Sequence, residues 1–322
     1  MKSDLFKRAL VMALAGVILT GSASALFGKK TPVAEEGAPT VNDIELTTYR
    51  GIPYTTQFLA SDGEGDDLAF SIVDKPRKGT VVIDGVNFTY TPDEGITGSD
   101  SFTYAATDSA GHVSTPAAVT ITIQKTRSGV TYADTDARSA YAAQEMAEKG
   151  IFTGAKIGDQ YYFEPDRTVS RSEFLAMTME MAGRDVTAVT MTGFSDDEAI
   201  PTWAKAYAAA GVADGIVQGS ATAEGVAFRA GEAITFNEAA ALLNRVLEVE
   251  NVDLEAWYAG RESVPTWASQ AVGNLEAVSV LRAGSFGSDT MGRSVTRADA
   301  AEMLTSAAAL LKGEDSPLDW LK

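Results

Sequence analysis

Three short motifs are the residues of this chain best suited to chemistry. They read Val169-Ser170-Arg171-Ser172-Glu173, Ile234-Thr235-Phe236-Asn237-Glu238 and Val295-Thr296-Arg297-Ala298-Asp299. In each motif a hydroxyl residue is followed three positions later by a carboxylate, which is the pattern of a capping box at a helix N-terminus. Capping accounts for the hydroxyl and the acid, because each pairs with a backbone N–H that would otherwise lack a partner. The motifs therefore predict three helix starts.

Capping does not account for the two arginines. Arg171 and Arg297 take the first helical position, where a positive charge meets the positive end of the helix dipole, while the second motif has Phe236 there. A guanidinium beside free backbone N–H groups is a suitable site for the carboxylate of a ligand. We therefore expect both arginines to bind an anion, and replacing either to weaken binding with little effect on the melting temperature.

The motifs belong to a longer repeat. From Tyr132 onward apolar residues follow a helical period, and several short segments recur about 64 residues apart. These pairs include Tyr132-Ala133-Asp134 with Phe194-Ser195-Asp196, Pro201-Thr202-Trp203-Ala204 with Pro265-Thr266-Trp267-Ala268, and Gly150-Ile151-Phe152-Thr153-Gly154 with Gly215-Ile216-Val217-Gln218-Gly219. Tyr258-Ala259-Gly260 is a third match to the first of them. We predict three helix–loop–helix copies at 131–187, 188–252 and 253–312, followed by a tail at 313–322.

These copies resemble S-layer homology repeats. The hallmark of that family is a Thr-Arg-Ala-Glu-like helix start after an aromatic-x-Pro turn, here Phe163-Glu164-Pro165, and a first helix that opens with Trp-Ala. The second copy lacks the proline, and the first has Arg138 where the tryptophan belongs. The resemblance implies an all-α three-repeat bundle with pseudo-threefold symmetry and grooves between copies. The ligand it implies is an anionic, often pyruvylated, secondary cell-wall polysaccharide.

The tryptophans allow two interpretations. Trp203 and Trp267 each open a predicted helix and offer a flat apolar face on which a sugar ring can stack. The alternative is plain core packing of that helix. The predicted polysaccharide-binding residues are therefore Arg171, Arg297, Trp203 and Trp267.

The segment 41–124 has a different pattern, in which apolar and polar residues alternate between turns such as Asp84-Gly85. Strands are predicted at Tyr54–Ala60, Leu68–Val73, Thr80–Ile83, Asn87–Thr91, Ser101–Ala106 and Ala118–Ile123. This spacing favours an antiparallel β-sandwich. Its Pro-x-x-Gly motif and its Asp100-Ser101-Phe102-Thr103-Tyr104 strand resemble bacterial Ig-like or cadherin-like modules, which implies a spacer or an adhesive module. A linker at 125–130 joins it to the repeats.

One loop of this segment is strongly acidic. Asp62, Glu64, Asp66 and Asp67 lie within six residues, and clustered carboxylates are the ligands that Ca²⁺ prefers. The alternative is a solvated turn that holds no ion. No other cofactor is expected.

The N-terminus predicts export. Lys2, Lys7 and Arg8 precede an apolar run, Ala9–Leu19, and Ala23-Ser24-Ala25 offers small residues for cleavage. We predict a signal peptide at 1–25 and a flexible leader at 26–40. The run is short for a membrane span, so no span is expected in the mature chain, the alternative being an uncleaved N-terminal anchor. The absence of cysteine excludes lipid attachment at a lipobox.

Composition excludes further classes. The formal net charge of −18 argues against binding to nucleic acid or anionic lipid. The single histidine, His112, lies in a turn-like segment, which argues against a histidine-based triad or metal site. We expect a non-catalytic protein of the cell wall or cell surface, held by its repeats and displaying the Ig-like module. The alternatives are a secreted adhesin or S-layer subunit whose repeats pack against other surface proteins, and a small glycan hydrolase using paired carboxylates.

Overall fold

The computed structural model describes residues 37–257, 264–281 and 291–311. The predicted signal peptide, most of the leader, the Tyr258-Ala259-Gly260 match and the tail lie outside these residues. Two compact units are found. The β unit comprises 37–129 with 136–141, and the helical unit comprises 130–135 with the described residues from 142 onward.

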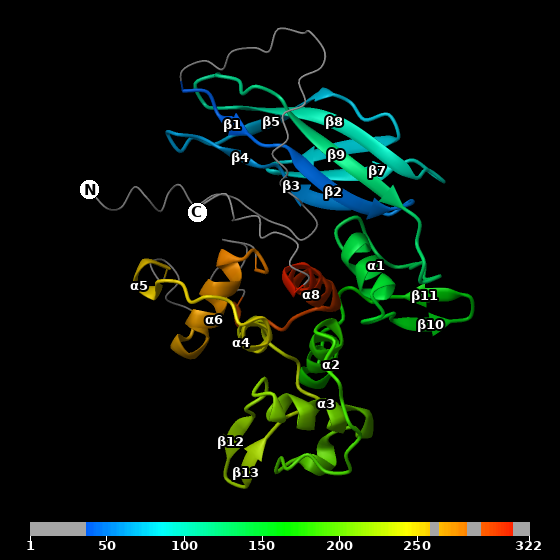
Figure 1. Ribbon diagram of the computed structural model, residues 1–322, viewed down its shortest axis with the longest axis vertical. Helices are drawn as coiled ribbons and strands as arrows, with labels where there is room; N and C mark the ends of the chain where they lie inside the picture. Colours follow the sequence, from blue (N-terminus) through cyan, green and yellow to red (C-terminus); the bar gives the residue numbers. More distant parts are fainter. Residues whose placement is uncertain (1–36, 258–263, 282–290, 312–322) are drawn as a thin grey trace. The chain divides into compact units, whose positions relative to one another are not determined.

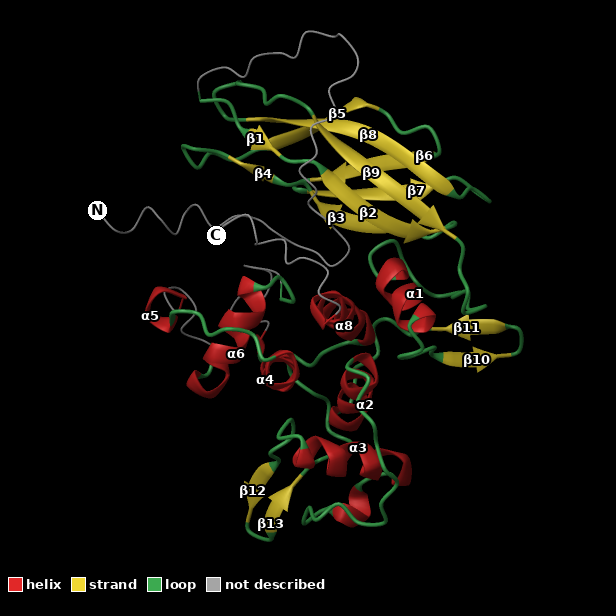
Figure 2. Cartoon of the chain, viewed as in Figure 1, coloured by secondary structure: helices red, strands yellow, loops and turns green. Residues whose placement is uncertain are grey.

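The β unit contains nine strands within the described residues (Figure 2). They are β1 (Thr40–Val41), β2 (Ile44–Tyr49), β3 (Tyr54–Gln57), β4 (Ala60–Ser61), β5 (Ala69–Asp74), β6 (Gly79–Asp84), β7 (Asn87–Pro92), β8 (Gly98–Thr107) and β9 (Ala117–Gln124). They form a four-stranded sheet in the order β2-β9-β8-β5, a three-stranded sheet in the order β3-β7-β6, and the pair β1-β4. Five of the six strands predicted from the alternation are present, while the predicted strand Tyr54–Ala60 is divided into β3 and β4, which belong to different sheets.

One pairing differs from the prediction of an antiparallel sandwich. Strand β2 pairs in parallel with β9, with Ile44 opposite Val119. Parallel neighbours need a long connection, and here most of the unit lies between the two strands. Alternation along the chain does not encode this partner, so the strictly antiparallel prediction is wrong at β2.

The core of the β unit is aromatic. Phe58 lies 4.6 Å from Phe70 and 4.6 Å from Tyr104, measured between ring centroids. The Tyr104 hydroxyl donates to the carbonyl oxygens of Asn42 at 2.6 Å and Leu59 at 2.9 Å. This buried hydroxyl therefore joins two segments that precede β2 and β4.

The Pro-x-x-Gly motif is a structural turn. The Asp100 carboxylate accepts hydrogen bonds from the backbone N–H groups of Arg77 and Lys78 and from the Tyr90 hydroxyl, at 2.8–3.0 Å. Burial and this bond to Asp100 raise the pKa of Tyr90. A Cβ atom on Gly79 would lie 2.5 Å from the carbonyl oxygen of Thr91, so only glycine fits there.

The helical unit is not all-α. Its elements are α1 (Ala140–Glu148), β10 (Ala155–Ile157), β11 (Gln160–Tyr162), α2 (Arg171–Met181), η1 (Asp197–Ala199), α3 (Thr202–Ala213), β12 (Ser220–Thr222), β13 (Gly225–Ala227), α4 (Phe236–Leu247), α5 (Leu254–Trp257), α6 (Thr266–Ala277) and α8 (Arg297–Leu311). The hairpins β10-β11 and β12-β13 contradict the all-α prediction. Strands of three residues are too short to show a sequence period.

The predicted capping boxes are confirmed. The Ser170 hydroxyl accepts from the Glu173 N–H at 3.2 Å, and the Glu173 carboxylate accepts from the Ser170 N–H at 2.8 Å. The second box has the same arrangement. In the third, the Asp299 carboxylate accepts from the Thr296 N–H at 2.9 Å. All three helix starts are therefore set by residues that are neighbours in sequence.

Three backbone hydrogen bonds join the residues that precede these caps. The Val169 N–H donates to Val295, the Val295 N–H to Ile234, and the Ile234 N–H to Val169, at 2.9, 2.8 and 3.0 Å. The three side chains are buried, and the bonds close a ring. Helices α2, α4 and α8, which start beside this ring, contact one another (Figure 1). The ring thus brings the three motifs to one place.

Candidate functional site

Arg171 links two distant segments of the helical unit. Its Nε donates to the carbonyl oxygen of Phe228 at 2.9 Å, and its Nη1 pairs with the carboxylate of Glu238 at 2.7 Å. Glu238 is itself the capping acid of α4. The Arg171 side chain is 13% exposed. The guanidinium at the start of α2 therefore binds the start of α4 and the turn before it.

Arg297 makes the corresponding link from α8. Its Nη1 donates to the carbonyl oxygen of Phe163 at 2.9 Å and to the Glu164 carboxylate at 2.7 Å. The guanidinium also lies over the ring of Phe152, 4.8 Å from its centroid. Burial lowers the pKa of Arg297, but an arginine keeps its charge at neutral pH.

Phe236 takes the same position at the start of α4 without a charge. Its side chain is fully buried. The guanidinium of Arg293 lies 4.8 Å from the centroid of its ring and pairs with Asp299 at 2.9 Å. Here the cation comes from the neighbouring segment, and the first helical residue supplies the aromatic face.

These contacts correct one expectation. Arg171 and Arg297 were expected to serve a ligand with little part in stability, but both cross-link segments of the fold. Their partners lie 57 and 134 positions away along the chain, beyond the reach of any local pattern.

Two turns carry the carbonyl oxygens that the arginines bind. The Asp134 carboxylate accepts from the N–H groups of Phe163 and Glu164, and Asp196 accepts in the same way from Phe228 and Arg229. Glu164 and Arg229 have positive φ angles of 55° and 58°, which ordinarily favour glycine. The aspartates of the recurring Tyr-Ala-Asp and Phe-Ser-Asp segments therefore stabilise strained turns by accepting their backbone N–H groups. The recurrence is visible in the sequence, but this role depends on contacts with residues about 30 positions away.

Both predicted tryptophans are exposed. Trp203 is 51% and Trp267 61% exposed, at the second positions of α3 and α6. Neither side chain is packed in the core. Each lines a pocket that also contains one of the predicted arginines.

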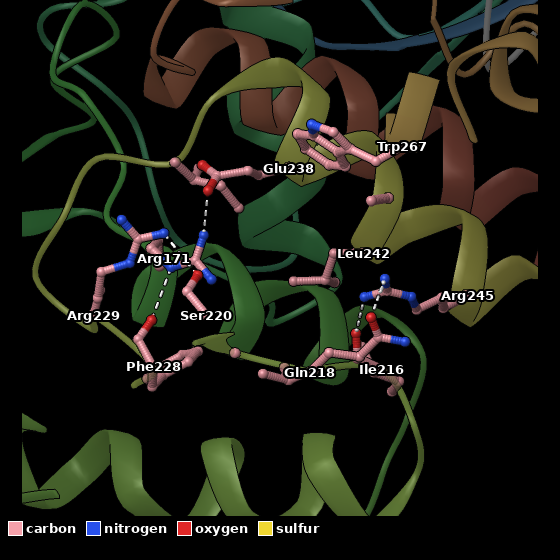
Figure 3. Close-up of a pocket in the computed structure, with 14 residues that line it drawn as sticks. Arg171, Ile216, Gln218, Ser220, Phe228, Arg229, Glu238, Leu242, Arg245 and Trp267 are labelled. Carbon is pink, nitrogen blue, oxygen red and sulfur yellow. Dashed lines mark hydrogen bonds and ion pairs between the residues drawn. The ribbon is translucent and has the colours of Figure 1, made fainter. Parts of the chain in front are cut away.

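Pocket A, of about 300 Å³, lies at the start of α2 and along α4. The residues that matter for its chemistry are Arg171, Arg229, Arg245, Glu238, Phe228 and Trp267. Figure 3 shows Arg171 and Arg229 at one end and Arg245 at the other, beside Ile216 and Gln218. The pocket is rich in cationic donors and has one exposed indole.

Pocket B, of about 640 Å³, lies along α2 and the start of α3. Its lining includes Arg297, Glu173, Glu180, Phe152, Trp203 and Tyr207. The Tyr207 hydroxyl donates to Glu180 at 2.6 Å. Pocket B is the more aromatic and the more acidic of the two.

The acidic loop of the β unit folds around its first carboxylate. One oxygen of Asp62 accepts from the N–H groups of Glu64, Gly65 and Asp66, at 2.8–3.2 Å. Within the residues that the structure describes, no group of three or more His, Cys, Asp or Glu side chains is placed to hold a metal ion. Calcium binding by Asp62, Glu64, Asp66 and Asp67 stays a prediction.

His112 is part of a turn, as expected from its sequence. Its N–H and its Nδ1 both contact the carboxylate of Asp108 at 2.8 Å. Across the described ranges, no helix combines the length and the apolar character that crossing a membrane requires.

Comparison with known proteins bears on the β unit. Residues 35–123 match the family model of the bacterial Ig domain. This match confirms the Ig-like prediction. No S-layer homology family is detected, and no curated protein matches the chain.

Solved structures give weaker likenesses. An endo-fucoidan hydrolase, MfFcnA4 of glycoside hydrolase family 107, is 25% identical over 29% of this chain and 14% of that chain, with a TM-score of 0.25. A mutant of the SrpA adhesin from Streptococcus sanguinis is 20% identical over 35% of this chain and 76% of that one, with a TM-score of 0.20. A titin domain is 13% identical over 29% of this chain and 98% of its own, with a TM-score of 0.19. Scores this low carry no argument about function.

Proposed function

We propose that this protein is exported and non-catalytic, and that its helical unit holds it at a cell wall by binding an anionic wall polysaccharide. The β unit is then the displayed Ig-like module. One observation carries the proposal: pocket A places the exposed Trp267 together with Arg171 from a helix start and two further arginines, and pocket B contains a second exposed tryptophan, Trp203. An indole face binds a sugar ring and a guanidinium binds a carboxylate, so the pair suits an acidic saccharide.

The arrangement of the helical unit supports three copies of one S-layer-homology-like repeat. The N–H-to-carbonyl ring runs from Val169 to Val295 to Ile234 and back, and always in one direction. The first helical residues make a second closed cycle in the opposite sense. Arg171 contacts the segment before the α4 cap, Phe236 the segment before the α8 cap, and Arg297 the segment before the α2 cap. Such a ring is expected of a bundle with pseudo-threefold symmetry.

Local charge supports the choice of ligand. The whole chain carries a formal charge of −18, which repels anionic polymers in general. Pocket A gathers three arginines against one glutamate. The positive charge of pocket A therefore offsets the repulsion of an acidic sugar by the rest of the negatively charged chain. Such a sugar binds at this pocket and not at the surface in general.

The competing proposal is that the repeats pack against other surface proteins, since exposed tryptophans also suit a protein interface. A pull-down on purified wall sacculi separates the two. The mature full-length protein should sediment with intact sacculi and stay in solution after the polysaccharide has been stripped chemically. Sedimentation that survives stripping would contradict polysaccharide binding.

Three variants sharpen the experiment. Trp203→Ala and Trp267→Ala should each weaken sedimentation, because each removes the stacking face of one pocket. Met191→Ala is the matched control, since Met191 is a large apolar side chain, 72% exposed, that lines neither pocket. A loss for Met191→Ala equal to that of the tryptophan variants would indicate a general apolar surface.

A further inference from the structure

Pockets A and B are built from matching positions. In each, a helix-start arginine faces the capping glutamate of another helix, namely Glu238 for Arg171 in pocket A and Glu173 beside Arg297 in pocket B. In each, a tryptophan at the second position of a following helix completes the wall. The two pockets can therefore be compared residue by residue.

At two of the matching positions the charge is reversed. Seven residues after the capping glutamate, pocket A has Arg245 and pocket B has Glu180. At the turn residue with positive φ, pocket A has Arg229, whereas Glu164 pairs with the arginine of pocket B. In pocket A, Arg171 pairs with Glu238 and Arg229 pairs with Glu232, so Arg245 adds a positive charge to two ion pairs. In pocket B, Arg297 pairs with Glu164, and Arg167 pairs with both Glu164 and Glu173, so Glu180 adds a negative charge.

The cations of pocket A are only partly neutralised. Arg245 donates to the carbonyl oxygen of Ile216 at 2.9 Å and to the side-chain amide of Gln218 at 3.2 Å, both uncharged acceptors. Arg229 donates to Ser220 at 2.8 Å and pairs with Glu232 at 3.1 Å, but its buried Nε has no hydrogen-bond partner. A ligand carboxylate would therefore meet, at Arg245, a positive charge whose acceptors are both uncharged.

Pocket B offers the opposite environment. The Arg297 side chain is 8% exposed, and its guanidinium is already bonded to Phe163 and Glu164. Glu180 accepts a hydrogen bond from the Tyr207 hydroxyl and lines the same pocket as Trp203, whose ring centroid lies 6.5 Å from that of Tyr207. Carboxylates beside aromatic faces bind an ammonium group and repel an anion.

We propose that pocket A selects a sugar that carries a carboxylate, and that pocket B selects a sugar that carries a free amino group. The inference rests on the proposed function and refines it: two chemically different residues of the polymer are bound at two matching pockets. It also withdraws Arg297 from the anion-binding role predicted for it.

The test uses the full-length mature protein labelled with 5-fluorotryptophan. The fluorine resonances of Trp203 and Trp267 are assigned from Trp203→Phe and Trp267→Phe, and the probes are glucuronic acid, glucosamine and N-acetylglucosamine. Glucuronic acid should shift the Trp267 resonance with at least about tenfold higher affinity than glucosamine, and glucosamine should be favoured by a similar factor at Trp203. N-Acetylglucosamine should bind more weakly than the charged probe at both positions.

Charge-reversal variants complete the design. Arg245→Glu should abolish the preference of the Trp267 site for glucuronic acid, and Glu180→Arg should create that preference at Trp203. Arg245→Gln and Glu180→Gln are the neutral controls and should give intermediate selectivity. Both positions, Arg245 in α4 and Glu180 in α2, lie on helix surfaces that line the pockets, and a thermal melt of each of the four variants reports its folding.

Three results would overturn the inference: equal shifts of both tryptophans by glucuronic acid, equal affinity of glucosamine and N-acetylglucosamine at Trp203, or no response of either resonance. If any of these occurs while the protein still sediments with sacculi, only the charge selection is wrong. If sedimentation itself is independent of the polysaccharide, the proposed function is wrong as well.

Discussion

The guanidinium of Arg297 donates to the carbonyl oxygen of Phe163 at 2.9 Å, although the two residues are 134 positions apart. This bond ties the start of α8 to the turn before α2. Because that turn is strained at Glu164, the arginine holds it in place as well as joining two segments. Arg297, which the sequence analysis assigned to ligand binding, therefore also stabilises the fold.

Replacing Arg297 with alanine should lower stability. The change leaves the buried Phe163 carbonyl without its charged donor, which costs about 1.5–3 kcal/mol, whereas Glu164 keeps its ion pair with Arg167. For a unit of this size, that corresponds to a drop in Tm of roughly 4–10 °C. Arg167→Ala is the matched control, because Arg167 is 50% exposed and its surface ion pairs contribute little. Equal Tm values for wild type and Arg297→Ala would contradict the cross-link.

Phe236→Ala should separate stability from binding. The side chain is fully buried under Arg293, so its removal should cost about 3–5 kcal/mol. Sedimentation with sacculi should be almost unchanged below the melting temperature, because the ring does not line pocket A or pocket B. Phe236→Leu should lose less stability. A binding loss as large as that of Trp267→Ala would assign Phe236 to the ligand site instead.

Removal of residues 253–322 should unfold the rest of the helical unit. The deletion takes away Val295, whose N–H and carbonyl make two of the three bonds of the ring, and the apolar residues of α6 and α8 that cover α2 and α4. Hydrogen exchange should show loss of protection at Val169 and Ile234. The amide of Ile121 in the separate β-unit core is the control and should stay protected. Retained protection at Val169 would show that the first two copies fold without the third.

Acid should weaken the helical unit through Asp197. Hydrogen bonds from Lys205 and Thr192 hold the pKa of Asp197 at about 2, below the ordinary 3.8. A carboxyl whose pKa is depressed by folding stabilises the protein above its unfolded pKa. That stability is lost as the pH falls from about 4 to about 2. The Tm difference between wild type and Asp197→Asn should therefore be largest near pH 6 and shrink toward pH 2. A difference that does not depend on pH would exclude this carboxylate as the cause.

Gly79→Ala should destabilise the β unit. The new Cβ would lie 2.5 Å from the Thr91 carbonyl and 2.7 Å from the Tyr90 ring, contacts that force the backbone to move. Overpacking of this kind costs about 1–3 kcal/mol. Gly63→Ala is the matched control, because a Cβ there meets nothing within 4 Å and no positive φ is required. Denaturant unfolding of the two variants provides the comparison.

The sequence alone was enough for every feature that depends on neighbours along the chain. The capping boxes were predictable because Ser170 and Glu173, three residues apart, satisfy each other's backbone groups whatever lies around them. Strands such as β9 were predictable because Val119, Ile121 and Ile123 must face the same side of a sheet. The match of residues 35–123 to the bacterial Ig domain agrees with these predicted strands.

Tertiary structure alone decided which distant segments meet. The parallel pairing of β2 with β9, the ring joining Val169, Ile234 and Val295, and the bond from Arg297 to Phe163 all depend on which surfaces are buried together. Helix capping and strand alternation depend on neighbours along the chain, whereas burial is a property of the whole chain. For the same reason the sequence revealed two helix-start arginines of equal appearance, and only the folded chain placed Arg245 in the pocket of one and Glu180 in the pocket of the other.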